Sequence, residues 1–329
     1  MVVDLYFPAF LPALTQNYPM PYLSKLAAVG AWHVDTQNTA EMHLCEAFGI
    51  RKSQDWPLAA LSRMGEGLDL GDAHYFIAHP AHFALQRDHF TLDAPGAISV
   101  DEARQLIRDL NAHFAQDGLR FEQGSKPDSW FLCSSQTIVA QTFLWAEAHG
   151  RDVRPLMPQG EDGMRCRSIM NQAQMLLHEH PVKQARELNG LSPVNSIWLS
   201  GGASEMTSEM TSEMKVRPLA IAQKIFARDA LTKGLAKSIA QEALSLPKHA
   251  QELMNLSGNQ DALVVIDEAN NLDVDWFLPL LSALKKAKIK TLRCHFGLDA
   301  KTFTLTVTPK DTWKFWRRIK PITQYFAQS

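Results

Sequence analysis

The chain has 329 residues, 46% of them hydrophobic, a composition that is too apolar for a disordered protein and sufficient for one large core or two moderate ones. The formal net charge of −2 excludes a general attraction to nucleic acid or to an anionic membrane, although it does not exclude a local basic patch. The N-terminal stretch has no basic leader, and no apolar run reaches the roughly 18 residues of a membrane span, so we expect a cytoplasmic protein.

The four cysteines, Cys45, Cys133, Cys166 and Cys294, are far apart and form no C-x-x-C pair. This spacing argues against a zinc knuckle and against a redox dithiol. We expect buried free thiols, the usual state of isolated cysteines in such a chain.

The N-terminal third begins with a strand. Residues 2–7 form an apolar run that ends at a proline, and residues 39–50 have a helical pattern that ends at a glycine. Thr39 stands at the expected N-cap of that helix, where its hydroxyl can accept a first-turn hydrogen bond. Residues 72–93 alternate apolar and polar side chains, which predicts two strands separated at Pro80.

Several histidines and an arginine lie in this alternating segment. His79 and His82 have the spacing H-x-x-H but lack a third ligand nearby, so we expect hydrogen-bonded or surface histidines rather than a metal site. Arg87 follows them, and its guanidinium is suited to bind a phosphate with two hydrogen bonds. The alternative is an ordinary surface arginine.

The middle third contains an S-x-x-E capping box at residues 99–102, which begins an amphipathic helix. Hydrophobic periodicity, with Gly and Pro as boundaries, then predicts strands at 119–122 and 130–133, helices at 164–180 and 182–189, and a strand at 194–199. Gly190 suits the left-handed end of the second of these helices. The last strand runs into Gly201 and Gly202, where backbone can approach a ligand closely.

The C-terminal part starts with a short repeat, SEMTSEMTSEM at residues 204–214. A period of four is too short for a solenoid, so we expect a surface loop; a methionine metal site is the alternative. The pattern then predicts strands at 218–223, 262–266 and 289–293, and helices at 224–243 and 275–286.

Residues 313–320, WKFWRRIK, combine aromatic and basic side chains. We expect the tryptophans to pack the end of the chain onto the sheet while the charges stay in solvent. Stacking on a nucleic acid strand is the alternative, which the acidic balance of the whole chain does not favour.

The stretch from His178 to Gly202, HEHPVKQARELNGLSPVNSIWLSGG, resembles one protein family. The archaeal-type cofactor-independent phosphoglycerate mutases have L-x-x-H-P-V-N, then Arg, then G-x-x-P-A-N before a strand and a Gly-rich turn. His180, Arg186 and Asn195 hold family positions here, and Lys183 replaces an Asn. The whole chain is also similar to bacterial regulatory proteins of the RpfE type, which are often described as phosphoglycerate mutases.

The resemblance implies a fold, a domain division and a ligand. The implied fold is α/β, with an alkaline-phosphatase-like core sheet flanked by helices at residues 1–73 and 197–329, and an inserted α+β lobe at 74–196. A phosphorylated three-carbon acid or another small phosphometabolite is the implied ligand. Its implied binding residues are Arg87, His180, Lys183, Arg186 and Asn195. A protein partner is left open, whereas membrane and nucleic acid are not expected.

Members of that family interconvert 3- and 2-phosphoglycerate through a phosphoserine and two divalent metals. In this chain Ala40 stands at the place of the nucleophile, while Asn271, Cys294 and Arg317 stand at ligand positions. We therefore expect a non-catalytic, regulatory or phosphometabolite-binding relative, with no catalytic residues, metal or other cofactor.

Two alternatives stay open. The first is an active metal-dependent mutase or phosphotransferase with a rearranged site, using Thr39 as the nucleophile and two divalent metals such as manganese or zinc. Asp4, Asp267 and His295 would support it, since each lies where the family has a metal ligand. The second alternative is a scaffold whose cleft holds no ligand and that only binds a protein partner.

Overall fold

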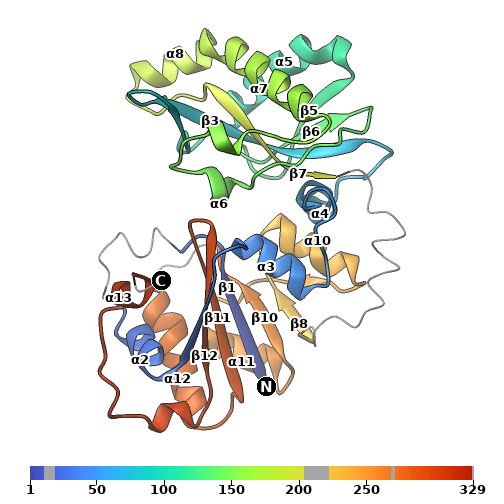
Figure 1. Cartoon of the computed structure of the whole chain (residues 1–329). Coiled ribbons are helices and arrows are strands. Elements are labelled where there is room, and N and C mark those ends of the chain that lie inside the picture. Colours follow the sequence, from blue (N-terminus) through green and yellow to red (C-terminus); the bar gives the residue numbers. More distant parts are fainter. Residues whose placement is uncertain (11–18, 204–221, 268–270, 328–329) are drawn as a thin grey trace. The chain divides into compact units, whose positions relative to one another are not determined.

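The chain is described here by a computed structural model covering residues 1–10, 19–203, 222–267 and 271–327 (Figure 1). It folds into two compact units, of which the first comprises Met1–Ile50 and Val216–Ser329 and the second Arg51–Lys215. None of the described helices is both long and apolar enough to cross a bilayer. The repeat predicted to form a loop at 204–214 lies outside the described residues.

The first unit is built on a seven-stranded mixed sheet of order β2-β12-β11-β1-β10-β8-β9. Its strands are β1 Val2–Phe7, β2 Ala31–Asp35, β8 Lys224–Phe226, β9 Ala243–Leu244, β10 Ala262–Val265, β11 Thr291–Leu298 and β12 Lys301–Val307. Pairing is parallel from β11 through β1 and β10 to β9, and antiparallel at β12 and β2. This central sheet with flanking helices confirms the predicted α/β class.

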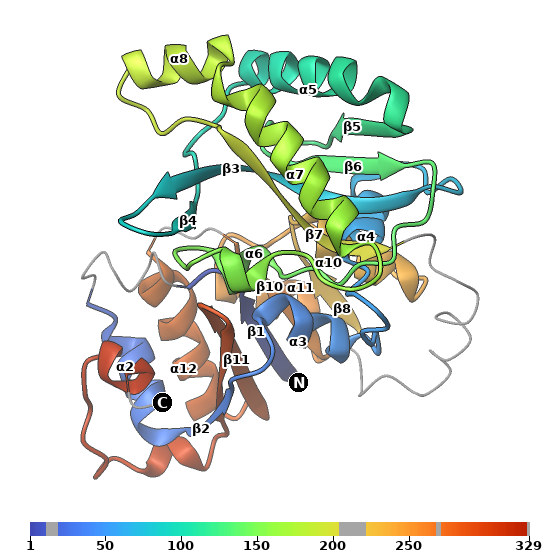
Figure 2. The same cartoon turned by 45° about the horizontal axis from the view of Figure 1, so that its top comes forward.

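Its helices are α2 Pro21–Val29, α3 Ala40–Ala47, α10 Ala230–Ser238, α11 Ala250–Ser257, α12 Leu278–Lys285 and α13 Thr323–Phe326. Strand alternation separates the two faces of the sheet. Val3, Leu5 and Phe7 of β1 enter the hydrophobic core together with apolar residues of α2, α11 and α12. Asp4 and Tyr6 lie on the opposite face, which α3 partly covers (Figures 1 and 2).

The second unit has a sheet of order β4-β3-β6-β5, with β7 paired to β3. Its strands are β3 His74–Leu85, β4 Phe90–Asp93, β5 Leu119–Gln123, β6 Trp130–Ser134 and β7 Ser196–Ala203. Its helices are α4 Leu58–Glu66, α5 Val100–Phe114, α6 Trp145–Ala148, α7 Gly163–His178 and α8 Pro181–Leu188. Apolar side chains of α5 and α7 share one hydrophobic core with the inner strands.

The predicted domain boundaries at 73/74 and 196/197 both fall within this second compact unit. Strand β7 pairs with β3 over most of its length, which keeps residues beyond 196 in the same sheet. Helix α4 packs closely on β7. A Cβ added at Gly201 would lie 2.7 Å from the Cβ of Leu58 on that helix. Gly201 therefore lies inside β7 with its backbone close to a helix, where the sequence had suggested a turn beside a ligand.

The structure corrects two predicted elements. Residues 72–93 do not break at Pro80, because β3 runs through it while pairing with β7. On one edge of β3, strand β6 pairs only up to Ile77 and strand β4 pairs only from His82 onward. Pro80 lies between these two pairings, so its missing N–H costs no hydrogen bond on that edge. The predicted helix at 224–243 forms only as α10, since its first residues are strand β8.

Gly297 provides a test of the packing at the end of β11. A Cβ there would overlap the carbonyl oxygen of Pro8 and lie 2.9 Å from the Cβ of Ala40. We expect Gly297→Ala to lower the free energy of unfolding by about 2 kcal/mol in urea titrations, the usual range for overpacking. Gly71→Ala is the matched control, because a Cβ at Gly71 meets only the Tyr75 hydroxyl at 3.9 Å. Equal stability of the two variants would contradict this packing.

Candidate functional site

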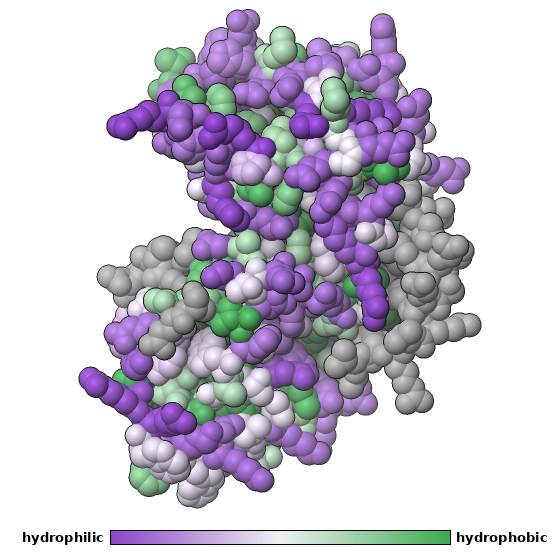
Figure 3. Space-filling view, in the orientation of Figure 1, coloured by the Kyte–Doolittle hydropathy of each residue, from purple (hydrophilic) through white to green (hydrophobic). Residues whose placement is uncertain are grey.

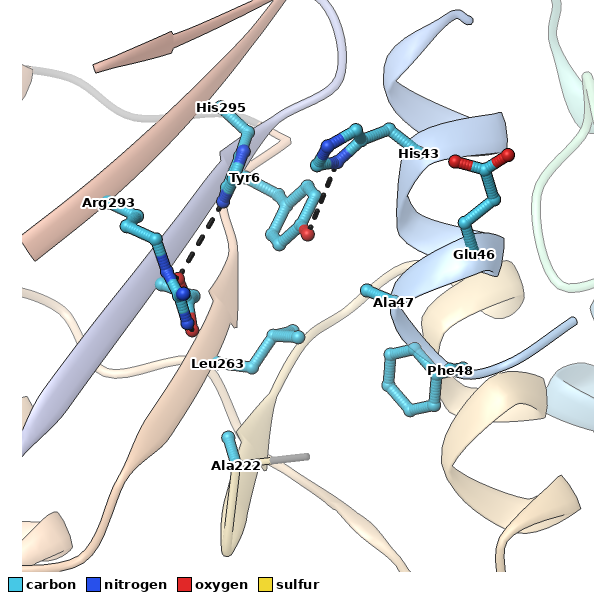
Figure 4. A pocket seen from close by; sticks show the side chains of 10 residues that line it. Tyr6, His43, Glu46, Ala47, Phe48, Ala222, Leu263, Arg293 and His295 are labelled. Carbon is cyan, nitrogen blue, oxygen red and sulfur yellow. Dashed lines mark hydrogen bonds and ion pairs between the residues drawn. The ribbon is translucent and has the colours of Figure 1, made fainter. Parts of the chain in front are cut away.

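A pocket of about 310 Å³ lies on the polar face of the first-unit sheet, beside α3 (Figure 4). It is lined by Asp4, Tyr6, His43, Glu46, Ala47, Phe48, Ala222, Leu263, Arg293 and His295. Because side chains alternate along a strand, Asp4 and Tyr6 of β1 share this face with Arg293 and His295 of the neighbouring β11. All ten residues belong to the first unit.

Asp4 and Arg293 form the polar centre of the pocket. The Nε and Nη2 of Arg293 both donate to the Asp4 carboxylate, the second at 2.7 Å from Oδ2. Burial alone would raise the pKa of Asp4, but hydrogen bonds from His295 and Arg293 lower it below its ordinary value. Asp4 is therefore a carboxylate whose charge Arg293 already balances, which leaves little of that charge for a bound metal ion.

Three rings stack beside this ion pair. His295 lies with its ring 4.2 Å from that of Tyr6 and 4.8 Å from that of His43, and the Tyr6 hydroxyl is 3.4 Å from the Nδ1 of His43. The Nδ1 of His295 is 2.9 Å from the Thr304 hydroxyl. The ring arrangement gives the pocket a continuous wall that can donate and accept hydrogen bonds.

The three rings are uncharged at neutral pH. Burial lowers the pKa of His43 to about 4, with the neighbouring His295 as a second cause. Burial also lowers the pKa of His295, against the opposing effect of Asp4, and raises the pKa of Tyr6. Arg293 is thus the only cation among the ten lining residues, and its side chain is 43% exposed.

The four residues of the predicted rearranged catalytic site do not gather in this pocket. Asp4 and His295 line it, 3.7 Å apart between Oδ1 and Nε2, whereas Thr39 and Asp267 do not. Asp4 is level with Leu263 on β10, whereas Asp267 lies two residues beyond the end of that strand at Val265.

Thr39 has the structural role that its position suggested. It is buried and is the N-cap of α3, and its Oγ1 accepts a hydrogen bond from Met42 N at 3.4 Å. Ala40, at the sequence-expected place of the nucleophile, is buried close to Gly297 and offers only a methyl group. At the start of α3, Thr39 therefore caps the helix and Ala40 makes a packing contact.

The remaining positions at which the family has metal ligands do not assemble a metal centre. Cys294 points into the hydrophobic core, on the opposite face of β11 from His295, and burial raises the pKa of its thiol. Arg317 is exposed. In the described part of the chain no group of three or more His, Cys, Asp or Glu side chains could hold a metal ion. These residues do not fit a two-metal site.

The five predicted ligand-binding residues lie in the second unit, and three of them hold separate segments of that unit together. Arg186 is buried and donates to Glu102 and to the carbonyls of Pro95, Ala97 and Ser192. His180 caps α8 through Val182 N and lies 3.0 Å from Asp109. Asn195 bonds the backbone N and O of Phe83. Their contacts fasten α8 and β7 to the unit.

Of the other two predicted ligands, only Arg87 is exposed, whereas the side chain of Lys183 is 16% exposed. Arg87 is exposed in the turn between β3 and β4, and Lys183 is 3.2 Å from Glu187 on α8. The sequence reasoning did not select Tyr6, His43 or Arg293. The available signal was the alternation itself, which places D-x-Y and R-x-H on one face of two strands.

Parts of the chain are similar to known phosphoglycerate mutases. A stretch of 114 residues is 31% identical to the 2,3-bisphosphoglycerate-independent phosphoglycerate mutase of Methanosarcina mazei, covering 32% of this chain and 27% of that protein. A stretch of 148 residues is 28% identical to the "Probable 2,3-bisphosphoglycerate-independent phosphoglycerate mutase" of Geobacter sulfurreducens, covering 44% and 36%. The matches thus span about a third of these relatives or less. No model of a known protein family matches the chain.

Two solved structures have a partial likeness to the chain. The cofactor-independent phosphoglycerate mutase from Thermoplasma acidophilum has a TM-score of 0.41 at 14% identity, over 93% of this chain and 89% of that one. The PH0037 protein from Pyrococcus horikoshii has a TM-score of 0.49 at 12% identity, over 93% and 87%. The sequence matches show a distant relationship to cofactor-independent phosphoglycerate mutases.

The Asp4–Arg293 pair has a testable dependence on pH. The folded-state pKa of Asp4 lies below the ordinary 3.8 of the unfolded chain, so the pair contributes its full stability above pH 3.8 and loses it as the pH falls through the folded value. We expect Asp4→Asn to cost about 1 kcal/mol at pH 7, a value reduced for the exposure of Arg293, and less at pH 3.

Urea unfolding of both proteins across this pH range measures the difference. Asp128→Asn is the control, because Asp128 is exposed and should change stability little at any pH. A cost for Asp4→Asn that stays constant down to pH 3 would show that the charge of Asp4 does not stabilise the fold.

Proposed function

We propose that this protein is a non-catalytic relative of cofactor-independent phosphoglycerate mutases that binds a small phosphorylated acid and acts as a regulatory protein, as the resemblance to the RpfE type implies. The observation that carries the proposal is that Arg293 already pairs with the Asp4 carboxylate. In addition, helix α3 begins with Ala40, which has no hydroxyl group. A phosphoserine mechanism needs a serine or threonine hydroxyl and carboxylates that bind metal. The residues that line the pocket include no serine or threonine, and the Asp4 carboxylate is already paired with Arg293.

The pocket suits an anion that carries further polar groups. Two of the guanidinium nitrogens of Arg293 donate to Asp4, and within the described residues no hydrogen bond involves its Nη1. That outward donor can bind one phosphate oxygen, while the neutral rings of His43 and Tyr6 can hydrogen-bond hydroxyl or carboxyl groups. A dianion beside His43 would also raise its pKa, so binding should take up protons.

The two predicted cations of the second unit remain separate candidates for ligand binding. Arg87 and Lys183 keep the role proposed for them from the sequence, whereas His180, Arg186 and Asn195 are assigned to holding the unit together. An active mutase using Thr39 has less support, because the Thr39 hydroxyl caps α3 and is buried. Variants in the two units can separate these possibilities.

The first test is binding without turnover. We expect isothermal titration to detect 3-phosphoglycerate but not glycerate, and we expect no conversion to 2-phosphoglycerate with added manganese. Arg293→Met should weaken binding roughly tenfold, since a hydrogen bond to a charged group contributes about 1.5–3 kcal/mol. Arg293→Lys, which keeps the charge, should weaken it less.

The paired control is Arg87→Met with Lys183→Met, which should leave affinity unchanged if the first-unit pocket binds the ligand. If only that control variant loses binding, the ligand binds to the second unit and not to the first-unit pocket. Turnover that depends on manganese and disappears in Thr39→Val would identify an enzyme and overturn the proposal, whereas the absence of any binding would leave only a protein-binding scaffold.

A further inference from the structure

The segment between β12 and α13 carries large apolar side chains in solvent, which corrects the prediction that its tryptophans pack on the sheet. Trp313 is 74% exposed, Phe315 87% and Trp316 69%, and Ile319 is 51% exposed. The segment runs along the lower edge of the first unit in Figure 1, and Figure 3 shows apolar and strongly hydrophilic side chains side by side there. We call residues 313–320 the aromatic-basic turn.

This turn is held in place, so its exposed rings are not those of a frayed end. Phe315 N donates to Trp313 O at 2.9 Å, and Arg317 N donates to Lys314 O at 3.1 Å, which makes the backbone compact. Lys314 is 2.6 Å from Asp311, and its Nζ is 3.4 Å from Val29 O. The cation of Lys314 therefore anchors the turn while the rings on either side of it face outward.

The remaining cations of the turn are available to a partner. Arg317 and Arg318 are exposed, as is Lys310 just before the turn. Within the described residues no salt bridge involves any of these three side chains. A local excess of positive charge thus surrounds the exposed rings, even though the whole chain has a formal net charge of −2.

We propose that the aromatic-basic turn docks the protein on the surface of an anionic lipid bilayer. Trp and Phe rings prefer the interface between headgroups and acyl chains, and arginine and lysine are attracted to anionic headgroups. Charge complementarity selects this occupant over a second copy of the chain, because two such turns would repel each other. The earlier expectation of no membrane contact came from the net charge of the whole chain, which hides this local patch.

The geometry also favours a lipid surface over a nucleic acid strand. Proteins that bind single strands use a groove that follows about 4–16 nucleotides, with successive aromatic platforms for the bases. Here the exposed rings share one tight turn, and Phe315 meets Trp316 edge-on with ring centroids 5.4 Å apart. Such an outward turn is suited to shallow insertion, in which the apolar rings leave water together.

Vesicle co-sedimentation of the full chain tests the proposal. We expect binding to vesicles that contain phosphatidylglycerol, weak or no binding to phosphatidylcholine alone, and weakening by salt. Trp313→Ala with Trp316→Ala should reduce affinity at least tenfold. Arg317→Glu with Arg318→Glu should do the same, since each cation near the surface contributes about fivefold.

Matched controls distinguish the effect of the aromatic-basic turn from the effect of charged or apolar side chains elsewhere on the surface. Lys126→Glu with Lys248→Glu makes the same charge change at exposed positions elsewhere, and Met175→Ala with Leu188→Ala removes exposed apolar side chains from the second unit. Binding should survive in both. No binding to anionic vesicles, equal losses in the controls, or binding of oligothymidylate in place of vesicles would overturn the proposal.

Discussion

The bidentate contact between Asp4 and Arg293 is the interaction on which the character of the first unit's pocket depends. It joins two adjacent parallel strands, β1 and β11, whose inner faces carry core residues such as Leu5 and Phe296. A carboxylate in this half-buried position needs a partner, and the guanidinium provides two hydrogen bonds. Once that pair forms, the carboxylate is no longer free to bind a metal, and the site becomes one suited to recognition.

The rings around the ion pair follow from the same arrangement. The pocket wall is made of neutral imidazoles and a phenol, because burial disfavours the charged form of each histidine. A phosphate approaching Arg293 would therefore meet hydrogen-bonding groups and a single cation. This combination agrees with the proposed binding of a small phosphorylated acid, for which one cation and several neutral hydrogen-bonding groups are sufficient.

The second unit shows how a sequence motif can be retained for architectural reasons. The block that carries the family resemblance supplies an N-cap through His180, a buried guanidinium through Arg186 and a backbone clamp through Asn195. Each contact satisfies backbone or carboxylate groups that would otherwise be buried without partners. Local architecture therefore accounts for these residues in this chain, and the motif alone is not evidence of activity.

The sequence by itself determined the α/β class, strand β1, the capped helix α5 and the cap at Thr39, because each depends on periodicity or on contacts between near neighbours. It selected Asp4 and His295 as candidates but could not pair Asp4 with Arg293, which lies 289 positions away. Only the tertiary structure decided which strands adjoin, how β3 passes through Pro80, and that the rings of Trp313 and Trp316 face solvent. Those outcomes depend on contacts between distant segments, which local sequence patterns do not specify.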